Sequence, residues 1–257
     1  MSITIFILTD FGTADTYVAQ MKGVLVSVCP QDARLVDLTH QVSRGSVAEG
    51  AFHLWASRVA MPGGSVVLAV VDPGVGTRRR CVIVRSGGVH FLGPDNGLFG
   101  LLSPEEAWEL PEPPRGSSRT FHGRDLFAPC AGRVASDPGW VDFLEELDPG
   151  SLVKCPIRPP SMIDGSLEAS VAHVDRFGNA ILWIDPVEYT GFLPGSILLP
   201  AGGTEELHHA DTYGDNTGLL YLAGSQGCME LALSGGSAGG TLGLLPGDRV
   251  LLRKMEK

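Results

Sequence analysis

The chain has 257 residues, enough to bury the core of one large domain or of two small ones. Its formal net charge of -10, with no basic cluster larger than the run at 77–80, argues against nucleic acid or an anionic membrane as the main partner. No apolar stretch approaches the length of a membrane span, and the five scattered cysteines form no C-x-x-C pair. These features predict a cytoplasmic protein without a disulfide framework.

Short apolar runs alternate with helical patterns over roughly the first 150 residues. The apolar runs predict strands at residues 3–8, 33–40, 65–72, 81–86 and 89–93. Three- and four-residue spacings, a Ser46-x-x-Glu49 capping box and two well-placed prolines predict helices at residues 18–28, 46–60, 103–110 and 123–135. This alternation indicates an α/β domain at 1–155 with a doubly wound, mainly parallel sheet.

The sequence pattern changes after a stretch rich in proline. Residues 156–164 are predicted to be a linker, and the chain then consists of short strands separated by Gly, Pro and Asp. The strands are expected at residues 167–175, 179–184, 196–200, 219–223, 229–234 and 248–253. We therefore predict a second domain at 165–257, an antiparallel β-barrel.

Two short motifs suggest a protein kinase and are excluded by their context. A D-F-G begins at Asp10, and an H-x-R-D pattern begins at His122. Kinase chemistry needs a glycine-rich loop and a lysine upstream of both motifs, with H-R-D preceding D-F-G. With the D-F-G at residue 10 we expect no room for them, and the order of the two motifs is inverted. A kinase is therefore excluded.

Three aspartates each follow the apolar run of a predicted strand: Asp10, Asp37 and Asp72. Ligands of open α/β sheets bind outside the carboxyl ends of the strands, so we expect these acids to line one crevice. Each alone is equally explained as a turn former. Asp10 has no basic neighbour, and its carboxylate suits a ribose diol because it can accept hydrogen bonds from both hydroxyls.

Seven blocks in this order resemble one family: "LTDFGTADTYVAQMKG", "VDLTHQV", "VAEGAFHL", "VVDPGVGTRRR", "LGPDNGL", "TFHGRDLFAP" and "VDRFGNAILWI". Together they are similar to the S-adenosyl-L-methionine (SAM) hydrolases, or SAM hydroxide adenosyltransferases, which are related to halogenating enzymes. The resemblance implies an α/β domain followed by a β-barrel, assembled as a homotrimer whose active sites lie at subunit interfaces. It implies hydrolysis of SAM to adenosine and L-methionine, with SAM as substrate and no cofactor or metal.

The family's catalytic set falls on Asp72, Arg79 and His122. Water must displace a sulfonium at C5′, and the neutral thioether that leaves needs no general acid. The difficulty lies in the nucleophile, because bulk water has a pKa of about 15.7. A carboxylate can orient the water and accept its proton, and an Arg and a His can stabilise developing hydroxide character. By the same resemblance, the predicted substrate-binding residues are Asp10, Asp175, Phe177, Asn179, Ser225 and Glu230.

Two alternatives stay open at this point. The first is a halide-dependent adenosyltransferase, although the halogenating relatives carry an aromatic residue where this chain has Asp72, whose negative charge would oppose a bound halide. The second is a sensor that binds SAM or adenosine without turning it over.

Overall fold

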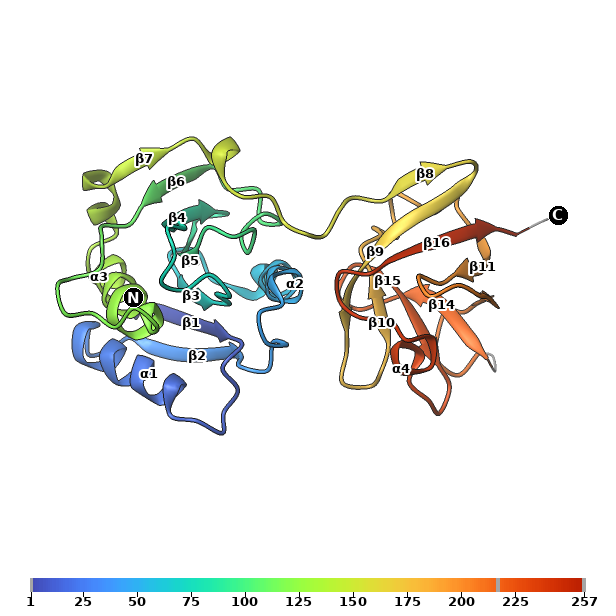
Figure 1. The fold of residues 1–257 in the computed structure, drawn as a ribbon, viewed down its shortest axis with the longest axis horizontal. Coiled ribbons are helices and arrows are strands. Elements are labelled where there is room, and N and C mark those ends of the chain that lie inside the picture. Colours follow the sequence, from blue (N-terminus) through green and yellow to red (C-terminus); the bar gives the residue numbers. More distant parts are fainter. Residues whose placement is uncertain (1, 216–217, 256–257) are drawn as a thin grey trace. The chain divides into compact units, whose positions relative to one another are not determined.

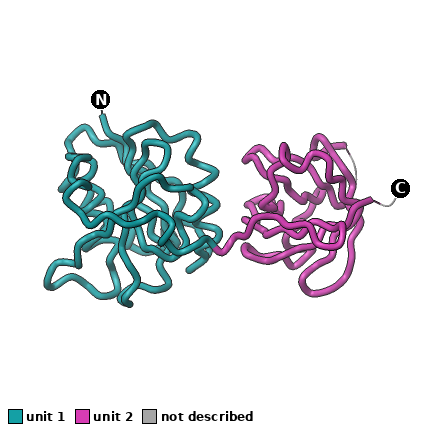
Figure 2. The backbone as a smooth tube through the Cα atoms, turned by 90° about the horizontal axis from the view of Figure 1, so that it is seen from above, with its two compact units in different colours: residues 1–155 teal, residues 156–257 magenta. Residues whose placement is uncertain are grey.

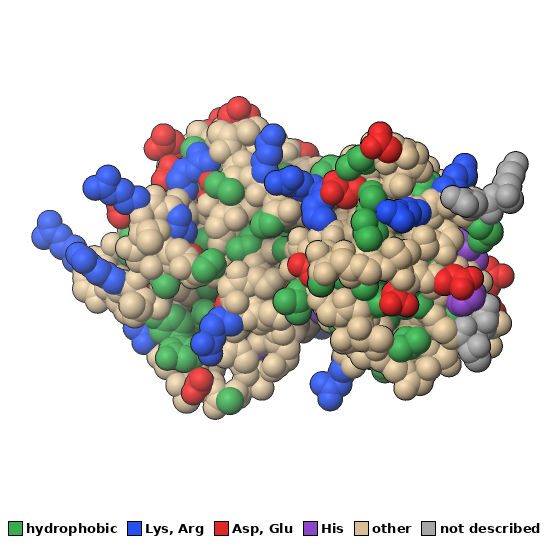
Figure 3. Space-filling model, turned by 45° about the vertical axis from the view of Figure 1, so that its right-hand side comes forward, with side chains coloured by type: hydrophobic (Ala, Val, Ile, Leu, Met, Phe, Trp, Pro, Cys, Tyr) green, Lys and Arg blue, Asp and Glu red, His purple; other side chains and the backbone are tan. Residues whose placement is uncertain are grey.

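The computed structural model describes residues 2–215 and 218–255. The chain divides into two compact units, unit 1 at Met1–Cys155 and unit 2 at Pro156–Lys257 (Figures 1 and 2). Among the described residues, no helix is both long and apolar enough to cross a membrane. Basic and acidic side chains are scattered over the face seen in Figure 3, with hydrophobic side chains between them.

Unit 1 is built on one seven-stranded sheet. Its strands are β1 (Thr4–Thr9), β2 (Arg34–Thr39), β3 (Val66–Val70), β4 (Cys81–Ser86), β5 (Val89–Pro94), β6 (Glu106–Glu109) and β7 (Glu145–Leu147). They lie in the order β2-β1-β3-β5-β4-β6-β7. The first four in this order run parallel, and the remaining pairs are antiparallel. The prediction of a mainly parallel sheet is confirmed.

Helices cover both faces of this sheet. They are α1 (Tyr17–Val28), α2 (Val47–Ser57) and α3 (Ala128–Ser136), with the π-helix η2 (Gly123–Phe127) directly before α3 and the short 3-10 helices η1 (Arg58–Ala60), η3 (Pro138–Phe143) and η4 (Pro149–Ser151). Because side chains alternate along a strand, Ile5 and Ile7 of β1 join the core beneath α1 and α3, whereas Phe6 and Leu8 join the core beneath α2. The sheet is therefore doubly wound, as predicted.

The prediction of a helix at residues 103–110 is wrong. Residues Glu106–Glu109 form strand β6 instead, which pairs with both β4 and β7. Ala107 and Trp108 are buried at this position. Pairing with β4 overrides the local helical signal, because a strand in this place continues the sheet and buries the tryptophan.

Unit 2 is a mostly antiparallel, nearly closed barrel. Its strands are β8 (Ser161–Ile163), β9 (Ser166–Val174), β10 (Ala180–Leu182), β11 (Pro194–Leu198), β12 (Thr204–Glu206), β13 (His208–His209), β14 (Leu219–Ala223), β15 (Met229–Leu233) and β16 (Arg249–Lys254), and its one helix among the described residues is α4 (Ala238–Leu242). Two strands adjacent in sequence almost close the sheet, because β12 pairs with β11 at one end and β13 pairs with β14 at the other. The predicted barrel is confirmed.

Candidate active site

Three side chains predicted to be catalytic meet in unit 1. Asp72 lies just beyond the end of β3, Arg79 lies two residues before β4, and His122 directly precedes η2. The loop that carries Asp72 and Arg79 packs closely against the segment before His122. A Cβ atom on Gly76, whose φ is +78°, would lie 2.6 Å from the carbonyl oxygen of Arg119. A glycine at this position therefore lets the two segments approach each other.

Arg79 lies between the other two residues of the set. Its Nε donates to Oδ1 and Oδ2 of Asp72 at 2.9 and 3.0 Å. Its Nη2 also donates to Asp72 and lies 2.9 Å from Nδ1 of His122. The side chains of Arg79 and Asp72 are only 9% and 3% exposed, so the ion pair is almost wholly removed from solvent. Such a buried, fork-shaped pair fixes the orientation of both groups.

The electrostatics assign a protonation state to His122. Burial lowers its pKa below the ordinary histidine value, and the neighbouring positive charge of Arg79 lowers it further. Burial also disfavours the charge of Arg79, but the hydrogen bonds and charge of Asp72 outweigh this effect and raise the pKa of the guanidinium. Since a guanidinium only donates, Nδ1 of the neutral His122 accepts from Arg79. The imidazole proton is therefore on Nε2.

His122 also borders a cleft of about 740 Å³ within unit 1. The cleft is lined by residues 76–78 of the loop after Asp72 and by the segment 112–119, which contributes Arg115 and Arg119. His122 is thus the member of the cluster that lines the cleft. The site therefore combines a buried charged cluster with an open side that can supply a nucleophile.

Asp10 and Asp72 follow the carboxyl ends of neighbouring parallel strands, as predicted. Asp37 was predicted to line the same crevice, but it lies within the edge strand. Strands β1 and β3 run parallel, with Thr9 opposite Val70, so the residues that follow them emerge together. Oδ2 of Asp10 accepts from the backbone N–H of Gly45 at 2.7 Å. Asp37 lies within β2 opposite Ile7, and its carboxylate binds Nζ of Lys22 at 2.6 Å. Its chemistry is that of an ion pair on the sheet edge.

In unit 2, the carboxylate of Asp175 organises the turn between β9 and β10. Oδ1 accepts from the backbone N–H groups of Phe177 and Asn179 at 2.9 and 2.8 Å, and Oδ2 accepts from the amide of Asn179 at 3.1 Å. The turn buries Asn179 but leaves the Phe177 side chain 81% exposed. The turn thus holds an aromatic ring that is exposed. A ring that served core packing would be buried.

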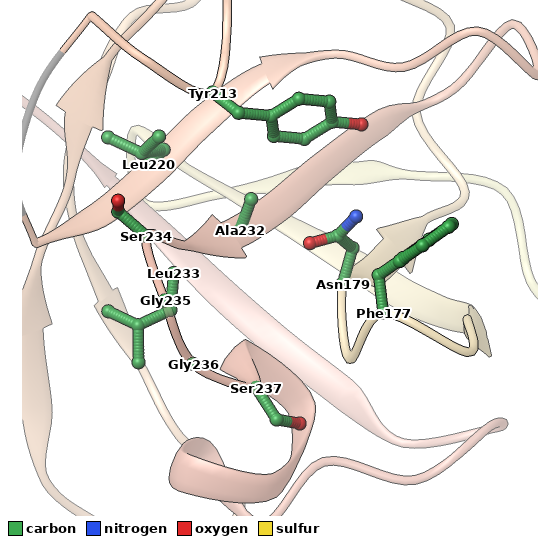
Figure 4. A pocket seen from close by; sticks show the side chains of 10 residues that line it. All are labelled: Phe177, Asn179, Tyr213, Leu220, Ala232, Leu233, Ser234, Gly235, Gly236 and Ser237. Carbon is green, nitrogen blue, oxygen red and sulfur yellow. The ribbon is translucent and has the colours of Figure 1, made fainter.

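A pocket of about 670 Å³ opens beside this turn (Figure 4). It is lined by Phe177, Asn179, Tyr213, Leu220, Ala232, Leu233, Ser234, Gly235, Gly236 and Ser237. In Figure 4 the ring of Tyr213 lies above Ala232, with its hydroxyl directed toward the side where Asn179 and Phe177 stand. Aromatic and apolar walls with a single amide suit a flat heteroaromatic ring.

Sequence reasoning missed Tyr213, which lies in a loop without a periodic pattern. Its hydroxyl donates to Oε1 of Glu230, and this bond, together with burial, raises the pKa of Tyr213 to about 12. Burial raises the pKa of Glu230, and the charge of Asp175 adds to the effect. The predicted residues Asp175 and Glu230 are therefore close enough to interact, and Tyr213 belongs with them.

Ser225 lies exposed in the turn between β14 and β15. The neighbouring Gly224 has no side chain, and a Cβ atom there would lie 2.4 Å from Oε2 of Glu230. The carboxylate of Glu230 therefore packs directly under the turn that carries Ser225. Of the five residues predicted for unit 2, Phe177 and Asn179 line the pocket, and Asp175 and Glu230 are hydrogen-bonded to residues that line it. Ser225 does not line the pocket and lies in the turn beside Glu230.

The chain is similar to known proteins over most of its length. Residues 5–142 match the family description "SAM hydroxide adenosyltransferase N-terminal domain", and residues 169–251 match the corresponding C-terminal domain. The chain is 38% identical to an (R)-S-adenosyl-L-methionine hydrolase of Salinispora arenicola, over 94% of both chains. It is also 38% identical to the enzyme of the same name from Thermus thermophilus, over 96% of this chain and 98% of that one.

More distant similarity extends to a fluorinase and to a solved structure. The fluorinase of Nocardia brasiliensis is 27% identical over 67% of this chain and 68% of its own. The crystal structure of an uncharacterized conserved protein from Thermotoga maritima has a TM-score of 0.86 and 27% identity, covering 97% of this chain and 100% of that one. On the two family matches and the full-length relatives, the chain belongs to the SAM hydroxide adenosyltransferase family.

Proposed function

We propose that this protein hydrolyses S-adenosyl-L-methionine to adenosine and L-methionine, with water as the nucleophile. The observation that carries the proposal is the buried cluster of Asp72, Arg79 and His122, assembled from two separate segments of unit 1. Membership of the family supports it, as do the names of the full-length relatives. The enzyme is proposed to need no metal, because the leaving thioether is neutral and the cluster supplies all the charge that the nucleophile requires.

The chemistry assigns a role to each member of the cluster. Both oxygens of Asp72 accept from Arg79, but a carboxylate has about four lone-pair sites and can also accept from a water molecule. As the C5′–O bond forms, the C5′–S bond breaks with its electron pair on sulfur, and the water passes a proton to Asp72 and then to solvent. Nε2–H of His122 donates to the oxygen of the attacking water, and Arg79 holds both groups in place. Alignment of this kind contributes about 7–11 kcal/mol in favourable cases.

The substrate is proposed to contact the N-terminal domain of one subunit, assigned to residues 1–155, and the C-terminal domain of a neighbouring subunit, assigned to residues 165–257. Asp10 would bind the ribose hydroxyls, because its carboxylate leaves the same sheet edge as Asp72. The pocket beside Phe177 and Asn179 would take the adenine and the adjoining part of SAM. Ser225 and Glu230 would bind the amino-acid end, and Glu230 is joined to the pocket by its hydrogen bond with Tyr213. We further propose a homotrimer in which the pocket of one subunit completes the active site of its neighbour.

Incubation of the purified protein with SAM in ¹⁸O-labelled water tests the reaction. Label in the 5′-hydroxyl of adenosine, at an unchanged rate after treatment with a chelator, is the expected result. Unlabelled adenosine, or methylthioadenosine as the only product, would overturn the mechanism. Chloride-dependent formation of 5′-chloroadenosine would favour the halide enzyme, and tight binding of SAM without product would favour the sensor.

A further inference from the structure

One hydrogen bond of Arg79 leads outside the proposed catalytic set. Its Nη1 lies 2.8 Å from Sγ of Cys81, the first residue of β4. Nε and Nη2 are directed at Asp72 and His122. The guanidinium is thus held at all three nitrogens, and Cys81 provides the only one of these contacts that does not come from the proposed catalytic residues. The face of the guanidinium also lies over the ring of Phe127, at 5.6 Å from its centroid.

We propose that Cys81 is a positioning residue for Arg79, and through it for His122. This inference rests on the proposed function. The Arg79 side chain is only 9% exposed, so an Nη1 group that loses its acceptor would be left largely unsatisfied. The side chain would then turn to find another acceptor. Because Nη2 belongs to the same rigid plane, this movement would carry it away from Nδ1 of His122.

The sulfur suits this role because it is uncharged. Burial raises the pKa of Cys81 to about 11, so the thiol is protonated at neutral pH. A neutral sulfur accepts a hydrogen bond weakly and does not compete with Asp72 for the positive charge of Arg79. An anionic side chain at this position would form a second ion pair and weaken the pairing with Asp72. Cys81 therefore restrains Arg79 without altering which carboxylate the guanidinium neutralises.

The chain offers a matched control in Cys130. It belongs to the same apolar core as Cys81, and the two residues are 8% and 9% exposed, respectively. Among the described residues, however, the hydrogen-bond partners of the Arg79 side chain are Asp72, His122 and Cys81, and Cys130 is not one of them. Replacing either cysteine with alanine removes the same atom from the same core.

The test compares Cys81→Ala, Cys130→Ala and Cys81→Ser with the wild type. In Cys81→Ala we expect kcat for SAM to fall about 10- to 100-fold, with KM nearly unchanged. We expect Cys130→Ala to lose thermal stability to a similar extent but to keep its kcat. Cys81→Ser should recover most of the rate, because its hydroxyl oxygen is also an acceptor. Equal kcat values in the two alanine variants would overturn the inference.

A second readout does not depend on catalysis. The pKa of His122, measured by NMR titration of the imidazole, is lowered by burial and by the charge of Arg79. Displacement of Arg79 in Cys81→Ala should therefore raise this pKa, whereas Cys130→Ala should leave it unchanged. If the wild type forms no adenosine, the proposed function fails while the titration still decides the role of Cys81. An unchanged pKa in Cys81→Ala would refute that role.

Discussion

The cluster of unit 1 and the pocket of unit 2 are built on opposite physical principles. The cluster is a charged network, with Arg79 and Asp72 buried and every nitrogen of the guanidinium engaged. The pocket is open and largely apolar, and its most prominent ring, that of Phe177, is 81% exposed. A buried ion pair has a large desolvation cost, which only well-aligned hydrogen bonds offset, and these bonds fix the geometry of both groups. An exposed ring provides contact area without such a cost. The contrast indicates reaction chemistry in the first region and recognition in the second.

The largest expected effect separates chemistry from stability. Asp72→Asn should lower kcat about 10²–10⁴-fold, because the neutral amide cannot take the proton from water. It should also destabilise the fold by about 3–5 kcal/mol, since Arg79 would remain buried without its counter-charge. Steady-state kinetics and thermal unfolding measure the two effects separately.

Asp95→Asn is the matched control for this variant. Asp95 is also buried, and it pairs with the neighbouring arginine, Arg80. Its replacement should destabilise unit 1 and leave kcat close to that of the wild type. A comparable loss of kcat in both variants would mean that Asp72 acts through the fold and has no chemical role.

A smaller effect is expected from a substitution that pushes apart the two segments that carry the cluster. Gly76→Ala would place a Cβ atom 2.6 Å from the carbonyl oxygen of Arg119 and should push the His122 segment away from Arg79. We expect a fall in kcat of about 10- to 100-fold. Gly64→Ala is the control, because Gly64 has the same left-handed backbone, with φ of +81°, and open space around its Cβ position. If both variants lose kcat equally, backbone strain alone explains the effect.

In the pocket, the expected effect is on binding. Phe177→Ala should raise KM for SAM about 2- to 10-fold, the range expected from the loss of an aromatic contact, and leave kcat within a factor of two. Thermal stability should hardly change, because the ring is mostly exposed. A large loss of kcat at unchanged KM would contradict the division of roles between the two regions.

The smallest effect concerns pH. Because the folded state lowers the pKa of His122 below its ordinary value, the unfolded chain takes up a proton first as the pH falls. The contribution of His122 to the free energy of unfolding is therefore fully present at a pH above the ordinary histidine pKa. It declines as the pH falls toward the pKa of His122 in the folded state. The rate should follow the folded value, since a protonated Nδ1 cannot accept from Arg79. A pH–rate profile whose acid limb is unchanged in His122→Gln would remove His122 from the mechanism.

The spacing of apolar and capping residues predicted several helices of unit 1 correctly. Of the predicted stripe Val18, Met21, Leu25 and Val28, the first three are buried in α1, whereas Val28 is 41% exposed. Ser46 caps α2 as predicted, but the carboxylate of Glu49 accepts from the backbone of Ser43 and so does not complete the capping box. The segment at 103–110 shows the limit of this reasoning, because its composition is helical while its place beside β4 makes it a strand. Asp37 shows the same limit for a site residue: it falls within the predicted strand at 33–40, and only the register with β1 shows that it lies opposite Ile7.

By itself, the sequence determined most of the elements of unit 1, the change from an α/β domain to short barrel strands, and the family resemblance carried by the motifs around Asp72, Arg79 and His122. The tertiary structure alone decided which nitrogen meets which acceptor. The contact of Arg79 with Cys81 and that of Tyr213 with Glu230 leave no signal in the chain. The physical reason is that such contacts depend on the packing of loops and turns, where no period constrains the residues, whereas strands and helices repeat their pattern along the chain.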